Sequence, residues 1–369
     1  MIYHWQRNRL IASMHSSLAS AIIRLSMRTT LTLFSVFVLS ISSLEAAPPK
    51  KLKLHHFFVN QDVPQMQMLQ PWADEVERLS EGQVEILIVP KMELGGKPKD
   101  LVSQASEGRI TDLIWTVNTY SGGFERSEVF ELPFVHTNNP AATNLAMREM
   151  FESDLKQEYA DKNLEVMFLH VHQGHAILSK RTDVLTPADM QGRRVRIAGR
   201  ITDWVAEELG GKTIATTVRQ IPQILQRAIA DTVLITANVI APLKLEQYIN
   251  SMTEGYQSTR FANAVLQVSM NRDTWISLSP EVKEAFLKAS DENFLRRIGK
   301  VWSDYELGGI ERLKTYKKKH IVLDQTQTAE FESALEPVID RWIMEVRSKG
   351  IDGKDLVQKA RALVQKHSK

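Results

Sequence analysis

The chain has 369 residues, enough for two domains of ordinary size. Hydrophobic residues make up 43% of it and charged residues 24%, and the formal net charge of +2 gives no argument for nucleic-acid binding, which calls for a concentrated basic surface. The sequence contains no cysteine, which excludes disulfides, thiolate metal sites and a cysteine nucleophile.

The N-terminal segment has the layout of a secretory signal peptide. It has a basic start at Arg28, an apolar run over residues 31–44 and small residues at Ala46 and Ala47. The apolar run is shorter than the roughly 20 residues that span a bilayer. We therefore expect a cleaved signal peptide over residues 1–46, with an upstream extension, and a periplasmic mature protein. The alternative is an uncleaved N-terminal anchor.

The next elements alternate between strands and helices. Strand patterns cover residues 51–59, 83–90 and 111–117, and helical patterns that end on glycines lie between them, over residues 66–79 and 97–110. This order at this spacing favours a doubly wound α/β unit.

The alternation begins again after residue 164. Strands are predicted over residues 164–172, 193–199, 212–217 and 231–238, helices over residues 200–211 and 218–230, a lone strand over residues 264–271, and one long helical stretch from Ser279 to Tyr316. Ser279 and Pro280 have the residue types of an N-cap and a first helical position. Two α/β units and an exported location together favour a periplasmic binding protein. The common nucleotide, zinc-protease and serine-hydrolase motifs are missing from the sequence.

The strand "RRVRI" carries the most informative charges. By alternation, Arg194 and Arg196 share one face of the strand, and Val195 and Ile197 share the other. An arginine in a buried strand is costly unless it pairs with an acid or serves an anion. A guanidinium fork suits bidentate capture of a carboxylate. These residues alone leave two alternatives open: a structural ion pair or a site for an anionic ligand.

Three histidines raise the alternative of a metal site. His170 and His172 share a face if "LHVH" is a strand, and His175 follows a glycine. A zinc site in a periplasmic enzyme would also need correct geometry and a second shell, and the nearest glutamate in sequence is Glu165. We predict no metal, no cofactor and no catalytic residue.

Aromatic side chains gather after the third predicted strand. Phe124, Phe130 and Phe134 are expected as core anchors under a long connection, whereas Trp115 and Tyr120 lie at the strand end and could wall a cleft.

The sequence resembles the DctP-type substrate-binding proteins of TRAP (tripartite ATP-independent periplasmic) transporters. Seven segments carry the resemblance, in order: "PKMELGG", "EGRITDLIW", "GGFERSEVFELPF", "TPADMQGRRVRI", "LGGKTIATTVRQIPQILQRAIAD", "MNRDTWISLSPEVKEA" and "WIMEVRSKGIDGKDLVQKARALV". The resemblance implies an α/β periplasmic binding protein fold, in which two lobes are joined by crossing strands and a long hinge-spanning helix. It also implies a receptor that closes around an organic acid and delivers it to the small and large membrane subunits of a permease.

The resemblance also implies domain boundaries. Lobe I is expected over residues 47–170, with residues 260–278 returning to it, and lobe II over residues 171–259. The C-terminal helices over residues 279–369 are expected to bridge the lobes and pack on both.

The family pattern assigns the carboxylate-binding role to Arg196, the match in "GRRVR", and makes Arg194 structural. His175 stands where many members have a second arginine, as a weaker and switchable contact. Ala228 and Thr232 replace glycines of the family pattern, which counts against a C4-dicarboxylate or sialic acid as the ligand, and a monocarboxylate with an apolar or aromatic body is favoured. The predicted ligand-binding residues are Arg196, His175, Trp115, Asn238, Thr236, Tyr120 and Phe57. The alternative partner is a sensor kinase, to which the receptor would present its ligand in place of a permease.

Overall fold

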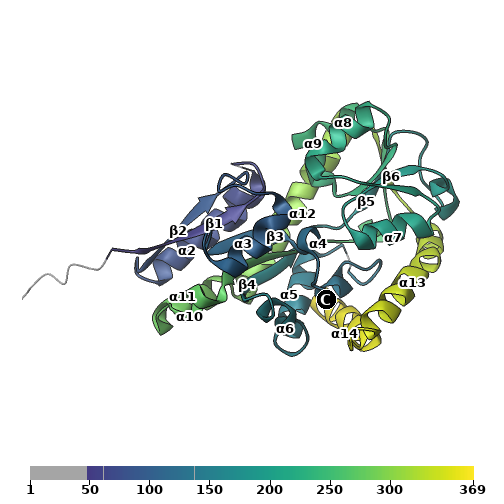
Figure 1. Cartoon of the computed structure of the whole chain (residues 1–369). Coiled ribbons are helices and arrows are strands. Elements are labelled where there is room, and N and C mark those ends of the chain that lie inside the picture. The colour runs from purple at the N-terminus through teal and green to yellow at the C-terminus, as the bar shows by residue number, and fades with distance from the viewer. Residues whose placement is uncertain (1–47, 61, 137) are drawn as a thin grey trace, which may run out of the picture. The chain divides into compact units, whose positions relative to one another are not determined.

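The computed structural model describes residues 48–60, 62–136 and 138–369, and the predicted signal peptide lies outside the described residues. Residues from Pro49 to the C-terminus form one compact unit. It contains two β-sheets with helices packed on them (Figure 1). None of the helices in the described ranges combines the length and apolarity that crossing a bilayer requires.

The first sheet has the strand order β2-β1-β3-β10-β4. Its strands are β1 (Lys50–His56), β2 (Val84–Val89), β3 (Leu113–Val117), β4 (Leu164–Val171) and β10 (Val265–Asn271). β1 pairs in parallel with β2 and β3, while β10 runs antiparallel to both β3 and β4. Helices α2 (Gln70–Leu79), α3 (Leu101–Glu107), α5 (Pro140–Met150), α6 (Lys156–Ala160), α10 (Arg272–Ile276) and α11 (Pro280–Ala289) belong to this part, which we call lobe I.

The second sheet has the strand order β11-β9-β5-β8-β6-β7. Its strands are β5 (Ala176–Ser179), β6 (Arg194–Ile197), β7 (Lys212–Ala215), β8 (Thr232–Ile235), β9 (Ser251–Glu254) and β11 (Lys319–Val322). Helices α7 (Arg200–Glu208), α8 (Ile221–Gln226) and α9 (Ile240–Leu243) lie around it and complete lobe II. β6 pairs in parallel with β7 and β8, so its arginines lie inside the sheet rather than at an edge.

Two chain segments cross between the sheets. One leads from β4 to β5 and the other from β9 to β10. They meet at His175, whose backbone N–H donates to the Ala262 carbonyl (2.7 Å) and whose carbonyl accepts from the Phe261 N–H (3.0 Å). The crossing segments therefore support each other by backbone hydrogen bonds next to the interlobe region.

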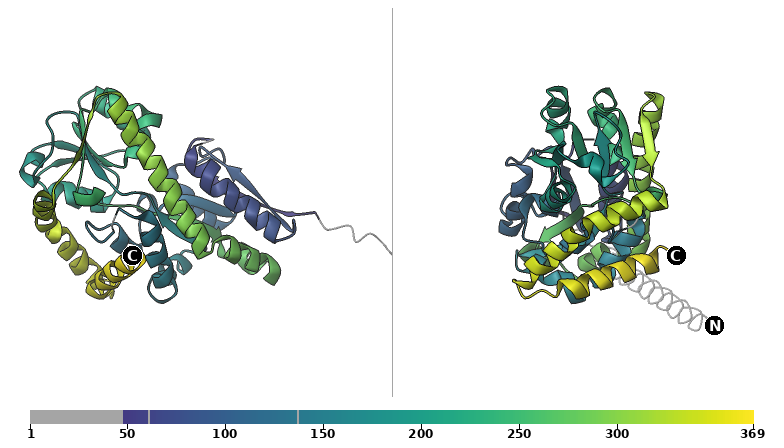
Figure 2. Two further views of the ribbon diagram at one scale, coloured as in Figure 1. Left: turned by 180° about the vertical axis from the view of Figure 1, so that it is seen from behind. Right: turned by 90° about the vertical axis from the view of Figure 1, so that its right-hand side faces the viewer.

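Helix α12 (Glu292–Thr315) packs on both lobes, as the views from behind and from the side show (Figure 2). Its first half contributes Phe294, Ile298 and Trp302 to the lobe I core. Its second half contributes Ile310 and Leu313 to the lobe II core. The long helix predicted from Ser279 is in fact two helices, because Asp291 accepts a hydrogen bond from the Phe294 N–H and starts α12 anew.

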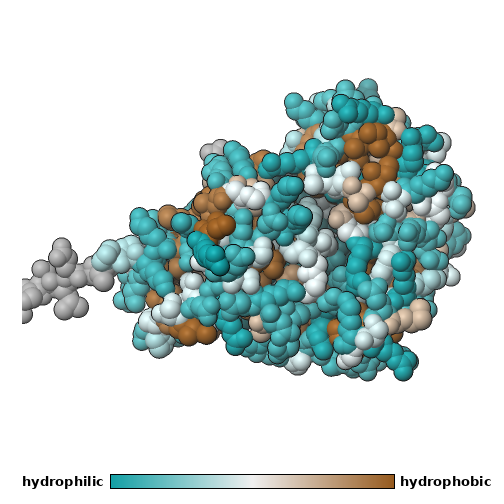
Figure 3. All heavy atoms as spheres, viewed as in Figure 1, coloured by the Kyte–Doolittle hydropathy of each residue, from teal (hydrophilic) through white to brown (hydrophobic). Residues whose placement is uncertain are grey.

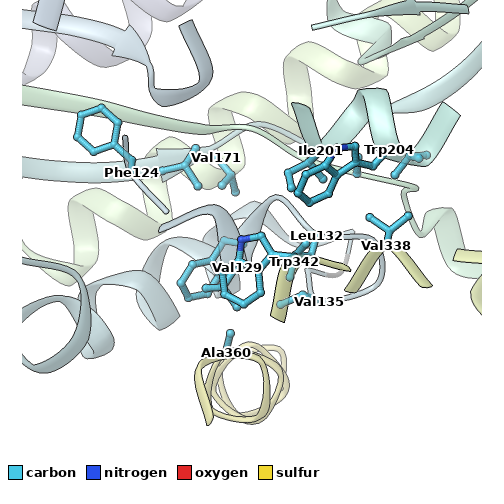
Figure 4. Packing of buried hydrophobic residues seen from close by; sticks show 14 of the residues in the cluster. Phe124, Val129, Leu132, Val135, Val171, Ile201, Trp204, Val338, Trp342 and Ala360 are labelled. Carbon is cyan, nitrogen blue, oxygen red and sulfur yellow. The ribbon is translucent and has the colours of Figure 1, made fainter. Parts of the chain in front are cut away.

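The C-terminal helices α13 (Gln325–Arg347) and α14 (Gly353–His367) complete the fold. α13 packs against α7 and α14 against α5, and so each C-terminal helix covers one lobe. Their apolar faces join Val129, Leu132 and Trp204 in one buried cluster (Figure 4). Hydrophilic residues cover most of the face shown in Figure 3, with hydrophobic residues in separate patches between them.

Candidate functional site

Two adjoining compartments lie between the lobes. The inner one has a volume of about 70 Å³ and the outer one about 690 Å³. They share Phe57, Phe58, Tyr120, Val218, Asn238 and Val239. Lobe I, lobe II, the crossing segment and α12 all contribute to the inner compartment, the last through Trp302. A molecule in this space therefore contacts both lobes and the segments that join them, and these are the parts that a hinge motion would move relative to one another.

Arg196 on β6 is the most unusual residue of the inner compartment. Its side chain is 1% exposed, yet none of the ion pairs among the described residues includes it. Nε and Nη2 both donate to the Thr216 carbonyl oxygen, at 3.1 and 2.7 Å. Burial lowers the pKa of Arg196 to about 10, so the guanidinium remains charged at neutral pH. A buried cation with no anionic partner is a strong indication of an anionic ligand.

The neighbouring arginines have ordinary structural roles. Arg194 donates to the Asp231 carboxylate at 3.2 Å. Arg193 is held by Ser179 and by the Thr182 carbonyl oxygen. The sequence left open a structural ion pair or a site for an anionic ligand. The ion pair therefore applies to Arg194, whereas Arg196 lines the inner compartment without an acidic partner among the described residues.

Three buried polar atoms around the inner compartment have no hydrogen-bond partner among the described residues. They are Nη1 of Arg196, Nδ1 of His175 and Oγ1 of Thr119. Buried polar groups are almost always hydrogen-bonded, because leaving one unpaired costs about 1–3 kcal/mol. Each of these three atoms can donate a hydrogen bond. Together they form a set of donors suited to the two oxygens of a carboxylate.

His175 is 3% exposed and is uncharged at neutral pH. Burial, reinforced by His172, Arg196, His136 and Arg260, holds its pKa well below the usual value of 6.5. A neutral imidazole still donates one hydrogen bond and accepts another. His175 can therefore contact a carboxylate as a dipole rather than as a charge.

Aromatic rings form the lobe I wall of the compartment. Phe57 packs edge-on against Tyr120, with ring centroids 5.3 Å apart. Phe58 stacks at 4.6 Å on Trp115, which is fully buried and lines neither compartment. Trp115 thus supports the wall from behind. Val117, one pleat further along β3, takes the lining position.

The lobe II side presents a polar pair and a buried acid behind it. The Thr236 hydroxyl donates to the Asn238 side-chain oxygen, and both residues line the inner compartment. The Glu306 carboxylate on α12 accepts the backbone N–H groups of Ala237 and Asn238, each at 2.9 Å. Arg260 on the crossing segment pairs with Glu306 and Glu254. The loop that carries Asn238 is therefore bound directly to α12, and through Glu306 it is linked to Arg260 on the crossing segment.

The other two histidines of the cluster make contacts within the protein, and His172 also lines the inner compartment. The indole N–H groups of Trp115 and Trp302 point at the two ring nitrogens of His170, at 2.9 and 3.1 Å. Nδ1 of His172 accepts the Gly174 N–H at 3.1 Å. Within the described part of the chain, no group of three or more His, Asp or Glu residues is arranged to hold a metal ion. These contacts leave the histidine cluster without a metal-binding geometry.

The sequence profile of "Bacterial extracellular solute-binding protein, family 7" (DctP) matches residues 56–345. The chain belongs to this family. This match confirms the family that the seven sequence segments indicated. It also confirms the prediction of a solute receptor rather than an enzyme.

Solved TRAP solute-binding proteins share the fold. One, from an unidentified marine microbe and in complex with 3-hydroxybenzoate, is 26% identical, with a TM-score of 0.82 over 88% of this chain and 100% of that one. Another, from Rhodoferax ferrireducens with copurified benzoate, is 27% identical, with a TM-score of 0.80 over 86% and 98%. A curated relative from Comamonas testosteroni, described as outer membrane transporter protein TsaT, is 18% identical over 80% of this chain and 86% of its own length. The two-lobed α/β fold is confirmed.

The candidate site also includes residues that the sequence did not single out. Thr119, Phe58 and Trp302 line the inner compartment, and their types carry no motif. Their places depend on how β3, β1 and α12 converge. Only Thr119 had a local signal for a place in the site, because it lies just beyond the end of β3 and next to Tyr120.

Proposed function

We propose that this chain is an extracytoplasmic receptor that binds an organic acid by its carboxylate and delivers it to a TRAP-type permease. The observation that carries the proposal is Arg196, a buried guanidinium with an unpaired nitrogen and no acidic partner among the described residues. The solved relatives with 3-hydroxybenzoate and benzoate support a carboxylate as the ligand group.

The two compartments together fit one carboxylate on an apolar or aromatic body, with the carboxylate in the inner one. Arg196 is the single arginine or lysine among the described residues that line it, which favours a single charge there. Phe57, Phe58 and Tyr120 supply flat apolar walls, and Thr236 with Asn238 supplies hydrogen-bonding capacity. We therefore propose Arg196, His175, Asn238, Thr236, Tyr120 and Phe57 as ligand contacts, with Trp115 supporting Phe58 from behind.

Ligand binding is coupled to lobe closure in this proposal. The carboxylate docks on Arg196 of lobe II, and the aromatic body meets Phe57 and Tyr120 of lobe I. Because both sets of contacts form only when the lobes are together, the ligand shifts the population toward the closed state. Residues 1–46 direct the chain to the periplasm, and the permease subunits recognise the closed receptor.

A thermal-shift screen of the mature protein against organic acids tests the proposal. Aromatic monocarboxylates such as benzoate and 3-hydroxybenzoate should raise the melting temperature, because a ligand that binds only the folded state stabilises it by an amount that grows with the ratio of ligand concentration to Kd. Arg196→Ala should abolish the shift. Arg194→Ala, on the same strand but paired to Asp231, is the matched control and should keep it. An undiminished shift in Arg196→Ala would refute the assignment.

A further inference from the structure

The outer compartment is far larger than one carboxylate on a ring requires. Its volume of about 690 Å³ lies in the range of roughly 300–1,000 Å³ typical of pockets for drug-sized ligands. It adjoins the inner compartment and shares Phe57, Phe58 and Tyr120 with it. Its remaining walls include Met92, Val239 and Leu243, which are apolar. A ligand that begins at Arg196 therefore has room to extend outward between apolar surfaces.

The rim of the outer compartment is cationic. Lys91, Lys97, Lys99 and Arg219 line it, against one acidic residue, Asp62, among the described lining residues. The Asp62 carboxylate already accepts a hydrogen bond from the Tyr305 hydroxyl at 2.8 Å. None of the ion pairs formed by described residues includes any of the three lysines. The positive charge of the rim is thus largely uncompensated.

The rim is attached to the wall of the inner compartment. Lys91 and Met92 both have left-handed backbone conformations, with φ of 56° and 60°, a strained state that clusters at functional sites. Their N–H groups donate to the Phe58 and His56 carbonyls at 2.9 and 3.0 Å. From lobe II, Nη2 of Arg219 donates to the Phe57 carbonyl at 2.9 Å. Both sides of the rim are therefore held at the segment that forms the aromatic wall.

We infer that the natural ligand is an elongated acid with a second anionic group, which lies at the basic rim while the first carboxylate lies on Arg196. This inference rests on the proposed function and extends it. One charge occupies the inner compartment, an apolar spacer passes Phe57 and Tyr120, and the second charge meets Lys91, Lys97 and Lys99. A short dicarboxylate fits less well, because both of its charges would lie in the inner compartment, which has a single arginine and no lysine among its described lining residues.

Calorimetric titration with three probes tests the inference. The probes are benzoate, a para-linked biphenyl dicarboxylate, and the same biphenyl with one carboxylate replaced by a carboxamide. The protein is used as wild type, as Arg196→Ala, as Lys97→Gln/Lys99→Gln, and as Lys53→Gln/Lys212→Gln. The last variant removes two charges that line neither compartment and is the matched control.

The dicarboxylate should bind wild type roughly three- to tenfold more tightly than the carboxamide, the ratio expected when partly exposed charge pairs form. The ratio should fall toward one in Lys97→Gln/Lys99→Gln, which keeps Lys91 and Arg219, and should persist in the control. Equal affinity of dicarboxylate and carboxamide for wild type would overturn the inference. So would an equal loss for benzoate and the dicarboxylate in the rim variant, because that would mean general steering. The proposed function fails separately, if benzoate and both biphenyl acids bind wild type and Arg196→Ala alike.

Discussion

Arg196 and Thr216 are joined by two hydrogen bonds from one guanidinium edge to a single carbonyl oxygen. This contact fixes the fork while leaving Nη1 buried and unpaired. Because the orientation is set by backbone rather than by an acid, the charge remains available to a ligand. The relation between these two residues separates Arg196 from Arg193 and Arg194, whose contacts are satisfied within the protein.

Replacing Arg196 by lysine should weaken carboxylate binding even though the charge is kept. A lysine ammonium lacks the planar fork and cannot hold the Thr216 carbonyl and a carboxylate in the same geometry. We expect a loss of about 1.5–3 kcal/mol in binding free energy, roughly ten- to a hundredfold in Kd. Calorimetric titration with 3-hydroxybenzoate measures it. Arg194→Lys should bind as wild type does, and a matching loss in that variant would indicate a general disturbance of β6.

Affinity for an aromatic acid should be constant between about pH 6 and pH 8. Burial holds the pKa of His175 well below its usual value, so the ring stays neutral across this range. The ligand carboxylate and Arg196 keep their charges throughout. The sequence alone suggested a switchable contact, and the surroundings of His175 in the structure remove the switch. A Kd that rises about tenfold per pH unit above pH 6 would show that a protonated His175 binds the acid.

Acid should destabilise the protein from about pH 6.5 downward. Burial lowers the pKa of His56 to about 4, and those of His170 and His172 to about 3. The folded-state values lie below the unfolded value of 6.5, so the unfolded chain takes up protons first as pH falls. The stabilisation is complete above pH 6.5 and is lost toward the folded-state values, by up to about 1.4 kcal/mol per pH unit for each histidine.

Urea unfolding at a series of pH values measures this loss. His56→Phe keeps an aromatic ring and removes one titrating group, so its stability should fall less steeply with acid than that of wild type. Parallel slopes for the two proteins between pH 6.5 and 5 would argue that folding does not lower the pKa of His56.

Gly309 on α12 should not tolerate a side chain. A Cβ at this position would lie 1.9 Å from the Ala237 carbonyl oxygen, in the loop that carries Asn238. Gly309→Ala should therefore displace this loop, destabilise the protein by about 1–3 kcal/mol and weaken ligand binding. Gly308→Ala is the matched control, because nothing lies within 4 Å of its Cβ position. It should be neutral or stabilising by up to about 1 kcal/mol. Melting temperature and Kd together separate the two outcomes.

Local patterns in the sequence predicted the elements and the key charge. The alternation in "RRVRI" placed Arg196 on a buried strand, and Ser279 does cap α11 by accepting the Val282 N–H. Trp115 was placed as a cleft wall because it lies near a strand end. Side chains two apart share a face, so Val117 takes that position and Trp115 lies deeper, against His170.

Tertiary packing determined what the sequence could not show. The short strands β5, β9 and β11 were not predicted, because each is stabilised by strands distant in sequence. Helix α5 was also not predicted, although Asn139 and Pro140 are local signals of its start. The basic rim brings Lys97 of lobe I near Arg219 of lobe II, which are more than a hundred residues apart. The pairing of Arg194 rather than Arg196 with Asp231 likewise depends on how β6 lies beside β8.

A crystal structure of the mature protein with bound 3-hydroxybenzoate would show whether Arg196 holds the ligand carboxylate. We expect a carboxylate oxygen about 2.7–2.9 Å from Nη1 of Arg196, the distance of a charge-assisted hydrogen bond, with the ring against Phe57 and Tyr120. A carboxylate bound away from Arg196, with Nη1 still unpaired, would contradict this expectation.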